Sequence, residues 1–321
     1  MPPVTVILNP YSGRGKGSQI RPALEAALRN AGLEFELLET SGKGHAIELT
    51  LAAKARGAEV ILSVGGDGTI NEVVNGLMRA TADSAVAGRL ALLPIGTGND
   101  FAMTLGQRPI ASFARNVQPR LDQLAHAIRQ GKQRLIDVGW GRVQSANTTI
   151  ERYFDNSMAA GLEAQSGIYS NRISGLPGRA IYTLAAIQAI ATYRAPDVQL
   201  RWNAPNGSPS RLDQRSLMIS IGNSHRTGGG FLITPDAKLD DGQFDVAVVR
   251  AQSRPALLAL LPRAMVGKHT THPAVTMLRT DEIEIISSEG LPVHMDGEII
   301  AECATHITAR ILPAKLAIVT A

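Results

Sequence analysis

Apolar positions in the first 134 residues fall into short runs separated by stretches with helical spacing. The runs have the length and composition of buried strands. Between residues 70 and 77, apolar side chains recur at i, i+3, i+4 and i+7, which marks one face of a helix. Strands that alternate with helices predict a parallel sheet covered by helices on both faces. The predicted strands are residues 4–8, 35–39, 60–64 and 90–93.

The pattern changes after Gly131. Short, often alternating segments separated by polar turns run to the C-terminus, and they predict an antiparallel sheet or sandwich. We therefore predict a domain boundary near residue 134, with an α/β domain at 1–134 and a β-rich domain at 135–311.

Two helical segments interrupt the β-rich half. Arg179 to Arg194 is apolar around most of its circumference and has basic ends, and Ala256 to Lys268 is similar, with Pro262 inside it. Such segments are either buried helices or a surface that enters lipid or lines an acyl-chain groove. Neither has an amphipathic pattern that decides between the two.

Composition narrows the class of protein. The chain has 321 residues with 44% hydrophobic and 19% charged residues, which fits two globular domains. Residues 1–134 carry 15 Lys and Arg against 11 Asp and Glu, and the remainder is balanced. This modest basic excess suits a nucleotide or an anionic membrane surface, and without a basic stripe interleaved with aromatics it excludes nucleic acid as the expected partner.

The termini and the cysteine content predict a cytoplasmic location. MPPVTVILNP lacks the charged start and long apolar stretch of a signal peptide. No apolar run reaches the roughly 18 residues of a membrane-spanning helix. Cys303 is the only cysteine, so no intramolecular disulfide forms, in keeping with a reducing compartment.

The stretch VILSVGGDGTINEVVNGLM, residues 60–78, is the strongest candidate for chemistry. A buried strand enters the turn Gly65 to Gly68, and a helix follows. The first amides of a helix have no partners within it, and together with the helix dipole they favour an anion such as phosphate. A tight strand-to-helix connection without a ligand also explains the glycines. The dinucleotide and P-loop patterns are both absent here.

Polar residues at the start of this helix add two expectations. Thr69 and Glu72 have the spacing of a capping box, which predicts a helix that opens at Thr69. Asp67 lies in a turn that favours an anion, so its carboxylate must hold a cation, orient a hydroxyl or amide, or cap the turn.

Further turns follow neighbouring predicted strands. Residues 9–13 follow the first strand, and PIGTGNDFA follows the fourth and places Asn99 and Asp100 at the mouth of another helix. Each is either a simple loop or a second backbone cradle at the carboxyl end of a strand, where open α/β sheets place ligands. If the strands before them are parallel neighbours, the glycine turns at 65–68 and 96–98 can face one cleft.

Acidic residues form two candidate sites in the β-rich half. In PVHMDGEII, Asp296 and Glu298 are two residues apart and face one side if the segment is extended, as a general base or Mg²⁺ site requires. A hairpin turn is the alternative. TPDAKLDDGQFDV, residues 234–246, is either a plain turn or a loop whose carboxylates and carbonyls suit a hard cation such as Mg²⁺.

These motifs resemble the diacylglycerol kinase catalytic-domain family, which includes sphingosine and ceramide kinases and bacterial lipid kinases. GGDGTINEVVNGL closely resembles its nucleotide-binding motif, although the shorter GGDGT also occurs in NAD kinases. GTGNDFA resembles the lipid kinases and is not a hallmark of NAD kinases. Matching segments are NP-x-SG at 9–13, T-x-x-x-G-[DH]-A from Thr40, A-x-L-x-D-G at 237–242 and the acidic motif at 296–298.

The resemblance covers nearly the whole chain and implies an ATP- and Mg²⁺-dependent lipid kinase. The implied fold is an N-terminal α/β domain like those of NAD kinase and phosphofructokinase, a β-sandwich C-terminal domain, and a nucleotide cleft between them. The final apolar segment, Leu316 to Val319, would return to the first domain as it does in the family, so that 312–321 completes it. Glu298, supported by Asp296, would take the proton from the lipid hydroxyl, with Asp296 as the alternative base and Asp67 as a third catalytic residue. A structural Mg²⁺ would be held by Asp241 and by the carbonyls of Lys238 and Gln243. The implied ATP-binding residues are Asn9, Pro10, Ser12, Gly13, Thr40, Gly65, Gly66, Asp67, Gly68, Thr69, Asn71, Gly96, Thr97, Asn99 and Asp100.

The acceptor implied by the resemblance is diacylglycerol, phosphatidylglycerol or a similar lipid. Because it lies in a bilayer, we expect peripheral binding at the inner face of the membrane. An edge strand can pair with a second copy, so a homodimer stays open. Two alternatives remain. One is a kinase of a soluble substrate such as NAD, although the sequence lacks a T-P-x-G-S-T-A-Y-like segment. The other is a nucleotide-binding lipid sensor without turnover.

Overall fold

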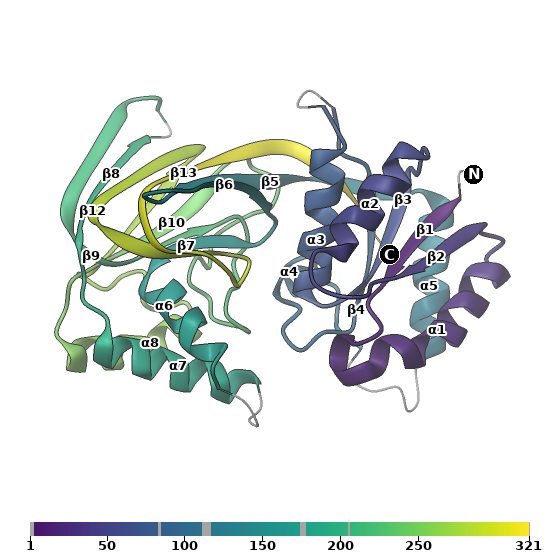
Figure 1. The fold of residues 1–321 in the computed structure, drawn as a ribbon, viewed down its shortest axis with the longest axis horizontal. Coiled ribbons are helices and arrows are strands. Elements are labelled where there is room, and N and C mark those ends of the chain that lie inside the picture. Colours follow the sequence, from purple (N-terminus) through teal and green to yellow (C-terminus); the bar gives the residue numbers. More distant parts are fainter. Residues whose placement is uncertain (1–2, 83–84, 111–116, 174–177, 205, 321) are drawn as a thin grey trace. The chain divides into compact units, whose positions relative to one another are not determined.

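The computed structural model describes residues 3–82, 85–110, 117–173, 178–204 and 206–320 (Figure 1). The chain divides into two compact units. Unit 1 comprises Met1–Ile136 and Ala314–Ala321, and unit 2 comprises Asp137–Pro313. The chain therefore crosses between the units twice, within strand β5 (Gln133–Gln144) and within strand β13 (Glu298–Val319).

Unit 1 contains a parallel sheet in the order β2–β1–β3–β4, with the C-terminal end of β13 beside β4. Apolar runs form these strands, as the hydrophobic pattern predicts. Ala317 and Ile318 pair with Arg89 and Leu90, so the last residues of the chain complete this sheet. The strands are β1 (Val4–Leu8), β2 (Phe35–Glu39), β3 (Val60–Gly65) and β4 (Arg89–Pro94).

Helices cover both faces of the parallel sheet (Figure 1). Alternate strand residues such as Val6 and Leu62 pack with Leu24 and Leu121 from two helices of one face, α1 and α5. On the other face α2 and α3 pack against each other and onto the strands. The helices are α1 (Ser12–Asn30), α2 (His45–Ala55), α3 (Asp67–Arg79), α4 (Asp100–Thr104) and α5 (Val117–Gln130).

Unit 2 contains an antiparallel sheet in the order β11–β10–β9–β7–β12–β13, to which β8 adds by pairing with β9 and β12, and β5 pairs with β6. Its core gathers the inward residues of these strands, and the rings of Phe154 and Phe244 stack at 5.5 Å. The remaining strands are β6 (Thr149–Phe154), β7 (Ser157–Gly161), β8 (Asp197–Asn203), β9 (Pro209–Gly222), β10 (Phe244–Arg250), β11 (Val275–Thr280) and β12 (Glu282–Met295).

Three helices pack on the strands of unit 2, namely α6 (Leu162–Ser170), α7 (Gly178–Thr192) and α8 (Arg254–Met265). Ile190 of α7 and Leu257 and Leu260 of α8 join residues of β9, β10 and β11 in one apolar cluster. The two predicted helical segments are thus helices, and their inner faces are buried. No helix in the part of the chain that the structure describes is long and apolar enough to span a membrane.

Candidate active site

Two glycine turns of unit 1 lie against each other. They follow β3 and β4, which pair as parallel neighbours, so both turns begin at the carboxyl edge of the sheet. A Cβ on Gly96 would come within 2.4 Å of Gly66 Cα, a distance that no side chain tolerates. Glycine is therefore required here because the two backbones touch.

Asp67 joins the two turns through hydrogen bonds. Its carboxylate accepts from the Asn99 amide at 2.6 Å and from the Phe101 amide at 3.4 Å, at the start of α4. Asn99 has a left-handed backbone (φ 59°), and its side chain accepts from the Gly96 amide and donates to the Gly96 carbonyl. Of the roles open to Asp67, the structure shows the orientation of amides.

The capping box predicted for Thr69 and Glu72 is wrong. Helix α3 begins at Asp67, after an extended Gly66, and no side chain caps it. The Glu72 carboxylate instead accepts from the amides of Gly44 at 2.7 Å and Ala46 at 3.1 Å, at the start of α2. The spacing rule assumes that both partners lie on one helix, whereas Glu72 caps the neighbouring helix that packs beside it.

The loop after β1 joins the same edge. Asn9 donates from Nδ2 to Thr69 Oγ1 at 3.0 Å. A Cβ on Gly13 would lie 2.2 Å from the carbonyl oxygen of Ile95, so this loop also touches the exit from β4. Helical hydrogen bonding starts at Ser12, but Gly13, Arg14 and Gly15 interrupt it with left-handed dihedrals.

The other predicted nucleotide residues have varied positions. Thr40 is buried at the end of β2, where its amide donates to the Leu8 carbonyl at 2.9 Å. Asn71 is buried within α3 and accepts from Asn75 Nδ2. Gly68 faces open space, and Thr97 is exposed. Asp100 is the first residue of α4 and buried, while Pro10 and Ser12 are partly exposed and Gly65 ends β3.

The acidic motif of unit 2 is a hairpin turn. Met295 pairs with Glu298, so Asp296 and Gly297 form a two-residue loop with φ of 48° and 80°. The interpretation of this motif as a hairpin turn is therefore confirmed. The alternative, an extended segment with Asp296 and Glu298 on one side, is wrong because the chain reverses at this point.

The Asp296 carboxylate binds three consecutive backbone amides. Oδ1 accepts from Asn156 at 3.0 Å and from Ser157 at 2.8 Å, and Oδ2 accepts from Asp155 at 2.9 Å. Both oxygens are therefore occupied by the chain that leads into β7. Glu298 instead forms an ion pair with Arg152 of β6, with 23% and 15% of the respective side chains exposed. No local pattern singles out Arg152, which lies 146 residues from Glu298 in the sequence.

A buried network supports this turn from the other side. Glu163 of α6 accepts from Thr227 Oγ1 at 2.8 Å and lies 3.3 Å from His294 Nε2. The Gly297 amide donates to His294 Nδ1 at 3.4 Å, so Nε2 carries the proton that faces Glu163. Ser157 in turn donates to Thr227. Glu163 is thus connected to the turn and to the segment that Asp296 binds, and the sequence did not single out Glu163 or His294.

The loop predicted to hold Mg²⁺ contains carboxylates in more than one environment. Asp241 accepts from the Gln243 amide at 3.2 Å and pairs with Arg279. Asp245, on β10, is buried, and its Oδ2 has no hydrogen bond, with Arg279 Nε 3.7 Å away. Burial raises the pKa of Asp245. Among the described residues no group of three or more His, Cys, Asp or Glu side chains is placed to hold a metal ion.

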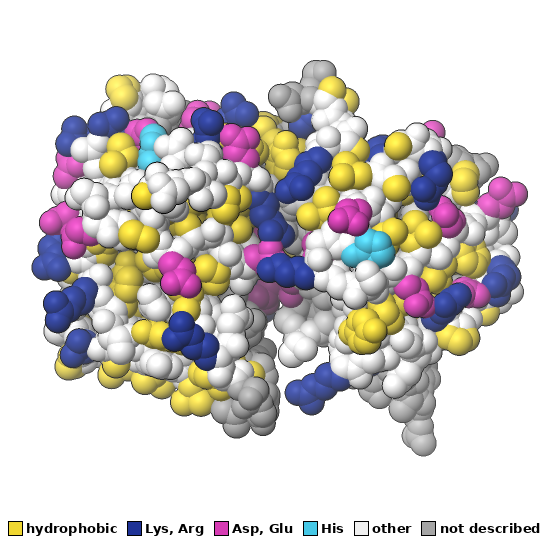
Figure 2. Space-filling model, viewed as in Figure 1, with side chains coloured by type: hydrophobic (Ala, Val, Ile, Leu, Met, Phe, Trp, Pro, Cys, Tyr) yellow, Lys and Arg dark blue, Asp and Glu magenta, His cyan; other side chains and the backbone are white. Residues whose placement is uncertain are grey.

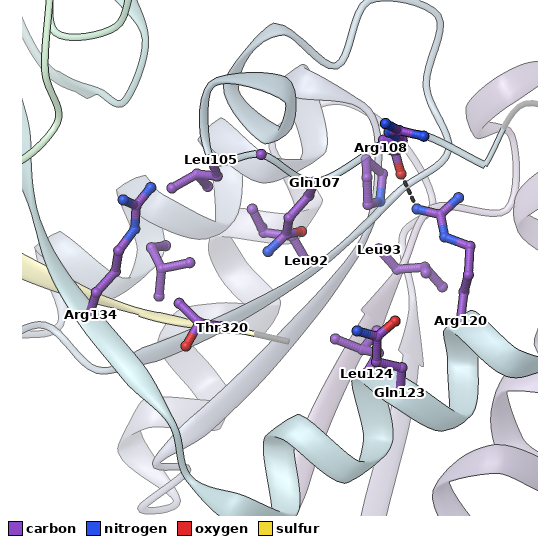
Figure 3. Close-up of a pocket in the computed structure, with 13 residues that line it drawn as sticks. Leu92, Leu93, Leu105, Gln107, Arg108, Arg120, Gln123, Leu124, Arg134 and Thr320 are labelled. Carbon is purple, nitrogen blue, oxygen red and sulfur yellow. Dashed lines mark hydrogen bonds between the residues drawn. The ribbon is translucent and has the colours of Figure 1, made fainter.

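A basic cavity of about 330 Å³ also lies in unit 1 (Figure 3). Arg108 and Arg120 lie at one end and Arg134 at the other, with Leu92 and Gln107 between them. Burial and the charge of Arg108 lower the pKa of Arg120. None of the residues predicted to bind ATP lines this cavity.

Comparison with known proteins identifies the family. Residues 3–140 match the model of the diacylglycerol kinase catalytic domain, and residues 156–320 match that of the YegS C-terminal NAD kinase beta sandwich-like domain. The chain belongs to the diacylglycerol kinase catalytic-domain family. Both halves of the sequence are covered by the two matches, which are in the order that the family resemblance implies.

Individual relatives are similar to this chain in sequence, and a solved structure is similar to it in fold. A protein of Staphylococcus aureus (strain MRSA252) named diacylglycerol kinase is 27% identical over 294 residues, which is 91% of this chain and 85% of the relative. One of Staphylococcus saprophyticus is 26% identical and is covered to 88%. A crystal structure titled as a diacylglycerol kinase of Bacillus anthracis str. Sterne has a TM-score of 0.69 at 21% identity, covering 99% of this chain and 97% of that one.

The predicted fold class is confirmed. A yeast NADH kinase in complex with NADH shares the fold at a TM-score of 0.53 and 10% identity, covering 100% of this chain and 84% of that chain. The N-terminal half is α/β with a parallel sheet, and the C-terminal half is antiparallel and β-rich. At this identity the similarity to the NADH kinase concerns the fold alone.

Proposed function

We propose that this protein is an ATP-dependent lipid kinase that transfers the γ-phosphoryl group of ATP to a lipid hydroxyl. The observation that carries the proposal is the joining of three loops at one sheet edge, through Asn9 to Thr69 and through Asp67 to Asn99. Loops held in this way supply fixed backbone amides for phosphates, and phosphoryl transfer depends mainly on positioning and charge neutralisation. Family membership and relatives named diacylglycerol kinase support the lipid acceptor.

Glu298 is the proposed general base that takes the proton of the lipid hydroxyl. The contacts of Asp296 support this choice over the alternative, because both of its oxygens already accept backbone amides. Asp296 then acts by holding the hairpin that carries Glu298. Arg152 contacts one carboxylate oxygen of Glu298 and orients the group.

Magnesium is the proposed metal cofactor. The donor types around residues 238–245 fit it, since carboxylate and carbonyl oxygens are its ligands and Mg²⁺ usually keeps several waters. Asp241 with the carbonyls of Lys238 and Gln243 would hold the ion, and the orphaned oxygen of Asp245 adds negative charge nearby. An ion bound there would be structural and would hold the loop, whereas Mg²⁺ bound with ATP would supply neutralisation of phosphate charge. Arg279 already contacts Asp241 and competes for that carboxylate.

The acceptor places the enzyme at a membrane surface. We propose peripheral binding at the cytoplasmic face, with diacylglycerol, phosphatidylglycerol or a similar lipid as acceptor. The test uses purified protein, Mg²⁺ and γ-labelled ATP with mixed micelles of a lipid panel, NAD as a soluble acceptor, and Glu298→Ala as the control.

Label in one lipid that is lost in Glu298→Ala would support the kinase and name the acceptor. Label in NAD would move the assignment to a soluble-substrate kinase. Bound ATP without transfer to any acceptor would instead favour a nucleotide-binding lipid sensor.

A further inference from the structure

The outer faces of helices α7 and α8 carry large apolar side chains that are exposed in the described part of unit 2. On α8, residues Leu258, Leu261, Pro262 and Met265 recur at i, i+3, i+4 and i+7, so they share one face. Leu258 and Met265 are each 44% exposed, whereas Leu257 and Leu260 on the opposite face are buried. The helix is therefore apolar on its solvent side as well as on its core side.

Helix α7 continues this surface. Leu184 and Ile187, three residues apart, are 47% and 41% exposed, and Val266 after α8 is 57% exposed. The two helices pack beside each other. Figure 2 shows hydrophobic side chains gathered along the edge of the unit where α7 and α8 lie in Figure 1. We call Leu184, Ile187, Leu258, Met265 and Val266 the outer apolar surface.

Only positive charge accompanies the outer apolar surface on these helices. Neither α7 nor α8 contains an Asp or Glu residue. Arg254 and Arg263 of α8 are exposed, as are Arg194 after α7 and Lys268 after α8. None of the four forms an ion pair with a residue of the described part of the chain, in contrast to Arg201 and Arg211 elsewhere in unit 2, which pair with carboxylates.

We propose that the outer apolar surface docks this protein onto an anionic lipid bilayer. A helix with exposed apolar side chains and basic neighbours binds in the plane of a membrane, because its apolar groups enter the acyl boundary while its cations contact anionic headgroups. Because α7 and α8 contain no Asp or Glu, neither helix has a negative charge that would repel anionic headgroups. The inference deepens the proposed lipid kinase, on which it rests for its purpose, but the binding itself requires no nucleotide.

The test measures sedimentation of the full chain with vesicles of phosphatidylcholine, with and without phosphatidylglycerol, in the absence of ATP. Wild type is expected to bind the phosphatidylglycerol vesicles, and more weakly as salt rises. Removing Arg254 and Arg263 together as R254Q/R263Q should weaken binding about 25-fold, roughly fivefold for each cation. L258S/M265S should weaken binding to these vesicles by about tenfold or more.

Matched controls separate the surface from general effects. V86S/I150S removes two exposed apolar side chains elsewhere, and R108Q/R134Q removes the same net charge from exposed arginines of unit 1. Both should bind vesicles as wild type does, and thermal melting should show that all variants are folded. The proposal is overturned if wild type ignores the phosphatidylglycerol vesicles, or if the surface variants bind no more weakly than their controls.

A kinase assay with a short-chain diacylglycerol below its micelle concentration separates docking from catalysis. Surface variants that phosphorylate this monomeric acceptor normally, yet fail with vesicle-borne diacylglycerol, support docking as the role of the surface. Vesicle binding by wild type with no phosphoryl transfer to either form would reject the proposed kinase and leave docking in place. Equal loss with both forms would overturn the docking role.

Discussion

Replacement of Asp296 by Asn tests whether this residue anchors the hairpin. Asn tolerates the left-handed backbone at φ 48°, so the main change is in hydrogen bonding. In the Asn variant, an amide oxygen in place of Oδ1 still accepts from the Asn156 and Ser157 amides, but these hydrogen bonds no longer involve a charged group. The NH₂ group then faces the Asp155 amide, and this hydrogen bond is lost because both groups are donors. A bond to a charged group contributes about 1.5–3 kcal/mol and a neutral one about 0.5–1.5.

Loss of one such bond, and weakening of two others by about 1–1.5 kcal/mol each, predicts a decrease of about 3.5–6 kcal/mol in the free energy of unfolding. Urea denaturation of wild type and D296N measures it. Lipid phosphorylation should fall as well, because the hairpin positions Glu298. Glu298→Gln is the matched control, and its partly exposed pair with Arg152 predicts a stability change of about 1 kcal/mol or less. A D296N protein within about 0.5 kcal/mol of wild type and fully active would refute the anchoring role, since even one lost charged bond exceeds that value.

Three further perturbations test other parts of the structure. Burial raises the pKa of Glu163, but hydrogen bonds from His294, Thr227 and Ser220 hold the pKa below its ordinary 4.5, so the ionised carboxylate stabilises the fold above that pH and this stabilisation is lost as pH falls through the lower folded pKa. The difference in unfolding free energy between wild type and E163Q should therefore narrow on acidification, which urea denaturation at several pH values measures. Asp245→Asn removes a buried carboxylate whose pKa is raised, so the free energy of unfolding at neutral pH should rise by about 1 kcal/mol. Any increase in melting temperature on addition of Mg²⁺ should become smaller in this variant, and an unchanged increase argues against a role of Asp245 near the ion. Asp67→Asn weakens the charged bonds to the start of α4, so the Asn99 and Phe101 amides should exchange hydrogen faster by mass spectrometry, and unaltered exchange would contradict the link.

The hydrophobic pattern was sufficient for the fold class. Parallel strands buried on both faces give continuous apolar runs, and one-sided strands alternate, so the change of pattern after Gly131 follows from burial. The glycine turns were also visible, because close backbone contact such as that of Gly66 with Gly96 excludes every side chain. These features depend on local chemistry, which a sequence displays directly.

Features that depend on distant partners were not predictable. Glu72 sits where a capping box would place it, yet it caps α2 because tertiary packing offers better donors. Arg152 of β6 contacts Glu298, and Glu163 of α6 contacts His294, on either side of the hairpin turn at Asp296. These partners are far apart in the sequence, so no spacing of residues predicts their contacts. The hairpin itself was one of two interpretations, and only strand pairing on both sides decides between a turn and an extended segment.

The return of β13 to unit 1 has a consequence for biosynthesis. Leu316 to Val319 are synthesised after the whole of unit 2, yet Ala317 and Ile318 pair with β4 of unit 1, and Lys315 donates to the carbonyls of Ala82 and Ala85. Until these residues are made, the rest of unit 1 exposes β4 as an open edge with unpaired backbone groups. A change to Leu316–Val319 therefore acts on a sheet whose other strands are made before unit 2, and the nascent chain must protect the edge of β4 until these residues have been synthesised.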